Sequence, residues 1–271
     1  RRKVARLRRQ RGSVGFVPTM GALHEGHLSL VDRARELADA VVVSVFVNPT
    51  QFGPDEDYEE YPRDLEGDLE KAGERGAHLV FAPSSSEMYP RKQTIWVDPG
   101  PLAERMCGRE RPGHFRGVLT VVLKLLHVVL AVFGRKDFQQ SVLVRRMTEE
   151  LNLPVEIDAA PVIREEDGLA MSSRNEYLSD EERAAARSLS RALAEVREAF
   201  AGGERDSGRL VRLARDVMEE AGAEVEYVEI VEPVGLDRVG RAHGDAVCAV
   251  AAHVGDTRLI DNASLAGGEG P

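Results

Sequence analysis

The stretch from Val14 to His27 constrains the fold most, because it has the pattern of a buried strand that turns directly into a helix. Its apolar opening is broken at Pro18 and Gly21, and the residues after His27 place apolar side chains at helical spacing. A helix N-terminus carries about half a positive charge and free N–H groups, so it attracts anions. With His24 and His27 at this turn, the stretch predicts a site for a nucleotide phosphate.

Two other interpretations of the histidine pair stay open at this point. His24 and His27 could be half of a metal site, although no cysteine or third histidine lies nearby in the sequence to complete one. They could also belong to an ordinary helix cap in which the imidazoles have no chemical role. The local pattern alone does not choose among these interpretations.

Strands and helices alternate through the first part of the chain. The clearest strand is residues 41–47, a β-branched run typical of a central parallel strand. We predict further strands at 77–81, 96–98, 131–133 and 155–163, and helices at 61–75, 118–129 and 138–151. This alternation indicates an α/β fold, a doubly wound parallel sheet of Rossmann-like type, over residues 1–168. Such sheets bind ligands at the carboxyl ends of their strands. We therefore expect one crevice lined by His24, His27, Asn48, Gln51, Arg135, Lys136 and Asp137.

The composition changes after Asn175, where Ala, Arg and Glu become frequent. We predict helices at 180–200 and 209–221, with Ser179 and Glu182 spaced as a capping box, and strands at 225–231, 246–254 and 258–260. These elements predict a smaller α+β domain over residues 169–271, which we expect to act as a lid. Residues 265–271 have the composition of a frayed tail.

Composition excludes several classes of protein. A formal net charge of −10 disfavours a nucleic-acid-binding surface, and no apolar stretch reaches the length of a membrane span. Cys107 and Cys248 are too few for a disulfide framework, which favours the cytoplasm. Residues 1–11 contain seven Arg or Lys and could form a basic arm, but Val4 and Leu7 favour an amphipathic helix.

Three further groups of polar residues, and one single acid, could carry chemistry. Gly134 to Asp137 places a glycine, two cations and an acid at a strand end, where Lys136 could hold a phosphate, although ordinary turns also have this composition. Gln51 and Gln140 would suit hydroxyl and carboxylate recognition, or could be surface residues. The loop from Met171 to Arg174 could close over a triphosphate, or could be only a linker. Asp68 could reach a magnesium ion.

Two of these motifs have counterparts in a known superfamily. His24-Glu25-Gly26-His27 resembles the HIGH box, and Met171-Ser172-Ser173-Arg174 resembles the KMSKS-type loop, of the HIGH-motif nucleotidyltransferases. The ordered set of strings from Val14 to Asn262 resembles the pantoate–β-alanine ligase family. The strings, which include the two motifs, are 17–27, 46–49 with 51–52, 61–63, 112–117, 133–134, 136–137, 139–140, 167–175 and 258–262.

The resemblance implies a two-step reaction. The carboxylate of pantoate attacks the α-phosphate of ATP and releases pyrophosphate, and the amine of β-alanine then attacks the resulting pantoyl adenylate and expels AMP. It also implies Mg²⁺ as a cofactor and a homodimer, while the charge and apolar content noted above predict no nucleic-acid or membrane partner.

The resemblance assigns roles residue by residue. The implied catalytic residues are His24, His27, Lys136, Ser172, Ser173 and Arg174. The implied ATP-binding residues are Met20, Gly21, Ala22, Leu23, His24, Glu25, Gly26, His27, Gly134, Arg135, Lys136, Asp137, Ile163, Met171, Ser172, Ser173 and Arg174. The implied pantoate-binding residues are Pro18, Met20, Asn48, Gln51 and Gln140, and Asp68 is the implied metal ligand.

The chain departs from the family pattern in three places. Arg135 stands where the family usually has Glu, Gly67 precedes Asp68 where some members have a second acid, and residues 127–133 form a shorter segment. Two alternatives are another nucleotidyltransferase of the superfamily, which would not need Gln51 and Gln140, and a nucleotide-binding or basic-arm interaction protein without catalysis.

Overall fold

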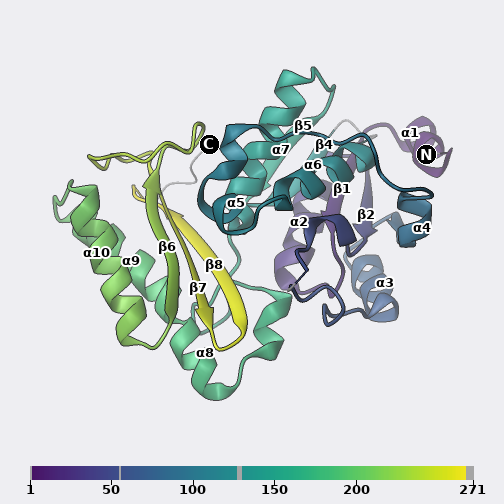
Figure 1. The fold of residues 1–271 in the computed structure, drawn as a ribbon. Helices are drawn as coiled ribbons and strands as arrows, with labels where there is room; N and C mark the ends of the chain where they lie inside the picture. Colours follow the sequence, from purple (N-terminus) through teal and green to yellow (C-terminus); the bar gives the residue numbers. More distant parts are fainter. Residues whose placement is uncertain (1, 55, 127–129, 267–271) are drawn as a thin grey trace. The chain divides into compact units, whose positions relative to one another are not determined.

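The structure is a computed structural model that describes residues 2–54, 56–126 and 130–266. The chain divides into two compact units (Figure 1). The first comprises Arg1–Gly134 and Leu143–Ala160, and the second comprises Arg135–Val142 and Pro161–Pro271. Within the described residues, none of the helices has the length and apolar character that crossing a membrane requires.

The first unit contains a five-stranded parallel sheet, which confirms the predicted fold class. The strands are β1 (Val14–Thr19), β2 (Ala40–Val45), β3 (Leu79–Phe81), β4 (Leu130–Gly134) and β5 (Glu156–Ala160). Their spatial order is β3-β2-β1-β4-β5, so the direction of winding reverses between β1 and β4. In a sheet of this kind the ligand crevice lies outside the carboxyl ends of the strands at that reversal.

Helices complete the first unit. They are α1 (Arg2–Arg11), α2 (Glu25–Leu37), α3 (Leu65–Glu74), α4 (Ser85–Met88), α5 (Met106–Glu110), α6 (His114–Leu125) and α7 (Phe138–Glu150), with the short 3-10 helices η1 (Pro49–Gln51) and η2 (Pro101–Glu104). α7 begins in the second unit, because its residues up to Val142 belong there. The side chains of Val17, Leu23, Leu28, Val31 and Val43 form part of one buried cluster, which anchors the start of α2 on the sheet.

Several predicted elements of the first unit have different bounds. Residues 96–98 do not form a strand; instead the N–H of Val97 donates to Thr120 Oγ1 at 3.0 Å, and the Arg116 guanidinium lies over the Trp96 ring. α3 begins four residues later than predicted, because the Asp64 side chain accepts the N–H of Gly67 and caps it there. The predicted strand 155–163 ends at Ala160. The end of the predicted helix 118–129 lies outside the described residues.

The second unit is an α+β structure built on an antiparallel sheet. Its strands are β6 (Glu224–Val231), β7 (Val247–Val254) and β8 (Thr257–Ser264), in the order β6-β7-β8. Its helices are α8 (Asp180–Ala186), α9 (Ser188–Ala201) and α10 (Ser207–Glu220), with η3 (Arg135–Asp137) and η4 (Ser173–Tyr177). The predicted single helix 180–200 is divided at Arg187. The predicted capping box of Ser179 and Glu182 is present.

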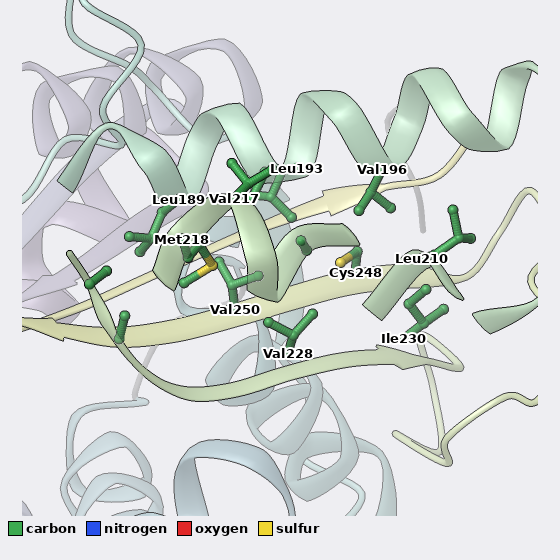
Figure 2. Close-up of a cluster of buried hydrophobic side chains, with 14 of the residues drawn as sticks. Leu189, Leu193, Val196, Leu210, Val217, Met218, Val228, Ile230, Cys248 and Val250 are labelled. Carbon is green, nitrogen blue, oxygen red and sulfur yellow. The ribbon is translucent and has the colours of Figure 1, made fainter. Parts of the chain in front are cut away.

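The core of the second unit lies where α9 and α10 pack on the sheet (Figure 2). Leu189, Leu193 and Val196 project from α9 toward side chains of the strands, among them Val250. The apolar spacing along α9 therefore marks the buried face of a helix. Residue 265 was expected in a frayed tail, but Leu265 is buried and its N–H donates to Ala246 O at 3.0 Å, which makes that part of the expectation wrong. Residues 267–271 of that tail lie outside the described residues.

Candidate active site

Three predicted site segments follow neighbouring strands of the parallel sheet. Residues 20–24 follow β1, residues 48–51 follow β2, and Gly134 is the last residue of β4. Because β2, β1 and β4 are adjacent and parallel, their carboxyl ends lie along the same edge of the sheet. This edge is the one at which the strand pattern placed a ligand crevice.

The turn between β1 and α2 has an unusual backbone. Gly21 and Ala22 both have positive φ angles, of 95° and 50°. A Cβ atom on Gly21 would lie 2.9 Å from both Asp68 Oδ2 and Val45 Cγ1, so a larger residue does not fit. Two consecutive residues with positive φ reverse the chain sharply, and they bring residue 24 to the start of α2.

His24 and His27 lie together at the N-terminus of α2. His24 is the N-cap residue, and its Nδ1 accepts the N–H of Gly26 at 3.1 Å. A neutral His24 therefore carries its proton on Nε2, which makes that atom a donor. The two imidazole centroids are 4.1 Å apart. Two rings at the positive end of the dipole of a helix of 13 residues form an arrangement that suits phosphate oxygens.

The structure also bears on the two other interpretations of this pair. The cap interpretation is correct in one respect, because the His24 ring caps α2. The described residues contain no group of three or more His, Cys, Asp or Glu side chains that could hold a metal ion. Within the part of the chain that is described, the histidine pair therefore has no third ligand.

Gln51 and Met20 meet beside this turn. Gln51 Nε2 lies 3.2 Å from Met20 Sδ, and Gln51 Oε1 accepts a hydrogen bond of 3.0 Å from Asn48 Nδ2. Asn48 is buried and also receives hydrogen bonds from the hydroxyl groups of Tyr89, at 2.7 Å, and Thr50, at 3.0 Å. The structure thus brings together three of the five predicted pantoate-binding residues, with an amide and a thioether next to each other.

The backbone of Gln51 is held by residues that the sequence analysis did not assign. The Gln51 carbonyl oxygen lies 2.7 Å from His114 Nδ1 and 3.3 Å from Arg111 Nη2. The Arg111 guanidinium is itself paired with Glu56. Arg111 lies in no motif, so its contact with Gln51 could not have been predicted from the sequence. His114 belongs to residues 112–117, a string that resembles the family.

Asp68 does not have the surroundings of a magnesium ligand. It is buried, with 1% of its surface exposed, and its two carboxylate oxygens accept the N–H groups of Ala22, at 3.0 Å, and Leu23, at 2.6 Å. Burial raises the pKa of the carboxyl, against the lowering effect of these two hydrogen bonds. Mg²⁺ requires an open octahedral shell with several waters, so the expected metal role of Asp68 does not fit its contacts.

In the second unit, β8 holds the turn that carries Lys136. The side-chain amide of Asn262 donates to the carbonyl oxygens of Arg135, at 2.9 Å, and Lys136, at 3.0 Å. Next to it, Asp261 forms a bidentate ion pair with Arg164 at 2.6 and 3.0 Å. Arg135 contacts β8 through its main-chain carbonyl oxygen. Gln140 lies one turn further along, in the first turn of α7, and is partly exposed.

The predicted KMSKS-type loop follows a short hairpin of the second unit. Met171 N–H donates to the carbonyl oxygen of Ile163 at 2.9 Å, and Arg164 forms a β-bridge with Ala170. Ser172 is the N-cap of η4, Ser173 is buried and Arg174 is partly exposed. The hairpin therefore fixes the main chain of residue 163 next to the loop.

Two acidic residues that precede the loop form ion pairs within the second unit. The Arg183 guanidinium pairs with the carboxylates of Glu165 and Asp167. The Asn175 side chain donates to Glu165 as well, at 2.6 Å. These contacts hold the loop at its base, so we assign Glu165 and Asp167 no contact with a ligand.

Comparison with known sequences gives a consistent result. The family model described as Pantoate-beta-alanine ligase matches residues 1–264. The pantothenate synthetase of Pelotomaculum thermopropionicum is 51% identical over 269 residues, covering 97% of this chain and 95% of that protein. The pantothenate synthetase of Heliobacterium modesticaldum is 53% identical over 258 residues, covering 94% and 92%.

Comparison with solved structures identifies the same family. A crystal structure of pantothenate synthetase from Thermus thermophilus matches with a TM-score of 0.92 and 46% identity, covering 97% of each chain. A structure of pantoate-beta-alanine ligase from Francisella tularensis, complexed with Beta-gamma ATP and Beta-alanine, matches with a TM-score of 0.78 and 33% identity. It covers 96% of this chain and 92% of that one.

Proposed function

Because the chain belongs to the pantoate–β-alanine ligase family and is a ligase that condenses pantoate with β-alanine through pantoyl adenylate, we propose the residues that carry out this reaction. The observation that carries the proposal is the turn after β1. There His24 caps α2 with Nδ1, so that Nε2 is left as the donor, and the His27 ring lies 4.1 Å away.

In the first step the pantoate carboxylate attacks the α-phosphate of ATP and pyrophosphate leaves. Negative charge grows on the bridging and terminal phosphate oxygens as the bond to pyrophosphate breaks. We assign the stabilisation of this charge to His24, His27 and the N-terminus of α2, with residues 20–26 forming the main-chain surface against the nucleotide. Fixed donors stabilise such charge without reorganising at the moment of reaction.

Pantoate is proposed to lie against Gln51 and Met20. The Gln51 amide, oriented by Asn48, would hydrogen-bond the pantoate hydroxyl or carboxylate without adding charge. Pro18 and the Met20 thioether offer apolar surface for the geminal methyl groups of pantoate. Gln140 is proposed to hold the same substrate from the start of α7.

The second unit is proposed to supply further phosphate and nucleoside contacts. Lys136, Ser172, Ser173 and Arg174 would stabilise the phosphates. Gly134, at the end of β4, and Arg135 and Asp137, with the main chain near Ile163 and Met171, would contact the nucleoside. Residues 169–271 would act as a lid that excludes water from the adenylate. Water exclusion matters because an acyl adenylate hydrolyses readily.

Three further properties belong to the proposal. Mg²⁺ would enter with ATP, bound by phosphate oxygens and water, which is its usual way of binding to nucleotide enzymes. The protein would act in the cytoplasm, where Cys107 and Cys248, both free and buried, stay reduced. It would form a homodimer, which light scattering of the purified protein can measure.

Isotope exchange between pyrophosphate and ATP tests the proposed function. Because adenylate formation precedes the use of β-alanine, exchange should require pantoate and proceed without β-alanine. Exchange without pantoate, or only with a different acid, would reject the substrate assignment. ATP binding with no exchange under any condition would support a non-catalytic nucleotide-binding protein.

Replacement of a glutamine separates this function from that of another nucleotidyltransferase. Gln51→Ala should raise the KM for pantoate at least ~10-fold and change the KM for ATP little, because it removes a substrate hydrogen bond. Gln10→Ala, on the exposed side of α1, is the matched control. An unchanged KM for pantoate would remove Gln51 from the pantoate site.

A further inference from the structure

We propose that Asp68 and Lys71 are positioning residues that together clamp the turn between β1 and α2, and that this clamp sets the rate of adenylate formation. The inference rests on the proposed function, since the turn they hold carries His24. Both residues come from α3, one helical turn apart, and both bind the main chain of the turn.

Asp68 and Lys71 form hydrogen bonds with the main chain of Leu23 and of the residue before it. Asp68 Oδ1 accepts the N–H of Leu23 at 2.6 Å, and Lys71 Nζ donates to the carbonyl oxygen of the same residue at 2.8 Å. Asp68 Oδ2 accepts the N–H of Ala22 at 3.0 Å. The clamp thus satisfies three main-chain polar groups in a turn that has no sheet or helix partner to satisfy them.

The turn needs such support because its backbone is strained. Ala22 has a φ of 50°, a conformation that a residue with a side chain rarely adopts unless its surroundings impose it. The N–H groups of Ala22 and Leu23 point to one carboxylate, which is the kind of partner that holds a left-handed turn. Gly21 completes the fit, because its missing Cβ leaves room for Asp68 Oδ2.

The positive charge of Lys71 balances the negative charge of Asp68. A buried carboxylate close to a proposed triphosphate site would repel the substrate if it stood alone. Lys71, three residues later on α3, supplies the balancing positive charge and binds the same residue of the turn. The clamp is therefore neutral as a pair, and it orders the turn without opposing the anion.

The position of His24 depends on this turn directly. Leu23 is buried with 1% of its surface exposed, and the next residue is the N-cap of α2. A shift of Leu23 would rotate the imidazole away from the phosphate, and a misplacement of about 1 Å can cost roughly 100-fold in rate. Asp68 and Lys71 themselves need not touch the substrate.

The test compares Asp68→Asn with Glu70→Gln, an exposed carboxylate two residues away on the same helix. The Asn amide nitrogen cannot accept an N–H, so one bond of the clamp becomes a repulsive contact. Asp68→Asn should lower kcat of pantoate-dependent pyrophosphate exchange at least about tenfold, since it displaces a transition-state donor. Glu70→Gln should match the wild-type protein, and Lys71→Met should lower the same kcat by a smaller factor.

Two readouts distinguish a positioning role from other roles. Synthetic pantoyl adenylate supplied with β-alanine bypasses the first step, so Asp68→Asn should form pantothenate from it at close to the wild-type rate. The Mg²⁺ concentration that gives half-maximal exchange should not change. Loss of both half-reactions would indicate general misfolding, and recovery of exchange at high Mg²⁺ would make Asp68 a metal ligand; either result overturns the inference. If the wild-type protein shows no pantoate-dependent exchange, the proposed function fails instead.

Discussion

Asn262 donates a hydrogen bond of 3.0 Å from its side-chain amide to the carbonyl oxygen of Lys136, although 126 residues separate the two along the chain. A second bond from the same amide group reaches the carbonyl oxygen of Arg135 at 2.9 Å. Strand β8 thus holds the main chain of η3, and the proposed phosphate-binding lysine is placed by a residue to which we assign no contact with substrate.

Replacing Asn262 tests this relationship. Asn262→Ala leaves two carbonyl groups of η3 without their donor, so the free energy of unfolding should fall by about 1–3 kcal/mol. The KM for ATP should rise as Lys136 loses its fixed position. Urea denaturation and pyrophosphate exchange measure the two effects. Ser264→Ala on the same strand removes only a long contact of 3.4 Å and should change neither.

His27 is predicted to be essential for adenylate formation. His27→Ala should lower turnover at least ~10²-fold, which is the usual scale for loss of one preorganised transition-state donor. Steady-state rates of pantothenate formation check this. His253→Ala, in β7 of the second unit, should retain full activity. A near-wild-type rate for His27→Ala would give that residue a structural role only.

Gly117 controls the position of the Gln51 loop. A Cβ atom on Gly117 would lie 2.1 Å from the Thr50 carbonyl oxygen and 2.8 Å from Gln51 Cα, and both of these are backbone atoms. Gly117→Ala should therefore displace η1, raise the KM for pantoate and lower the free energy of unfolding by about 1–3 kcal/mol. The Cβ of Gly73→Ala, inside α3, meets nothing within 4 Å. That control should leave activity unchanged.

The Arg164–Asp261 ion pair is expected to stabilise the second unit. Asp261 is buried, and its burial raises the pKa of the carboxyl although Arg164 opposes this rise. Arg164→Met would leave a buried carboxylate without its guanidinium, and thermal and urea unfolding should show a loss of about 3 kcal/mol. Arg146→Met breaks an exposed pair on α7 and should cost less than about 1 kcal/mol. Equal losses in the two variants would contradict this prediction.

Cys248 is predicted to be inert in the folded protein. Complete burial raises the pKa of its thiol from 9.0 to about 12, so the nucleophilic thiolate does not form at about pH 8. In a Cys107→Ser background, a thiol reagent should label the chain only after denaturation. The folded chain also keeps this proton where the unfolded chain loses it, so the contribution of Cys248 to stability should fall as pH rises from 9.0 toward about 12.

Local patterns in the sequence determined much of the fold. The β-branched run of β2 and the helical spacing after His27 depend on neighbouring residues, so they predicted a parallel sheet and the strand-to-helix turn. The capping box of Ser179 and Glu182 was predicted for the same reason, because both partners lie within one helical turn. The family strings added the reaction, which no spacing rule contains.

The tertiary structure decided what each polar group of the turns binds. Asp68 lies 45 residues from Leu23, and nothing in its helix distinguishes a carboxylate that binds main-chain N–H groups from one that binds magnesium. The spacing of Asn262 and Lys136 likewise contains no periodic signal. Such pairs meet only when the sheets have formed, since it is the packing of α3 on β2 and of β8 on η3 that brings their atoms within hydrogen-bonding distance.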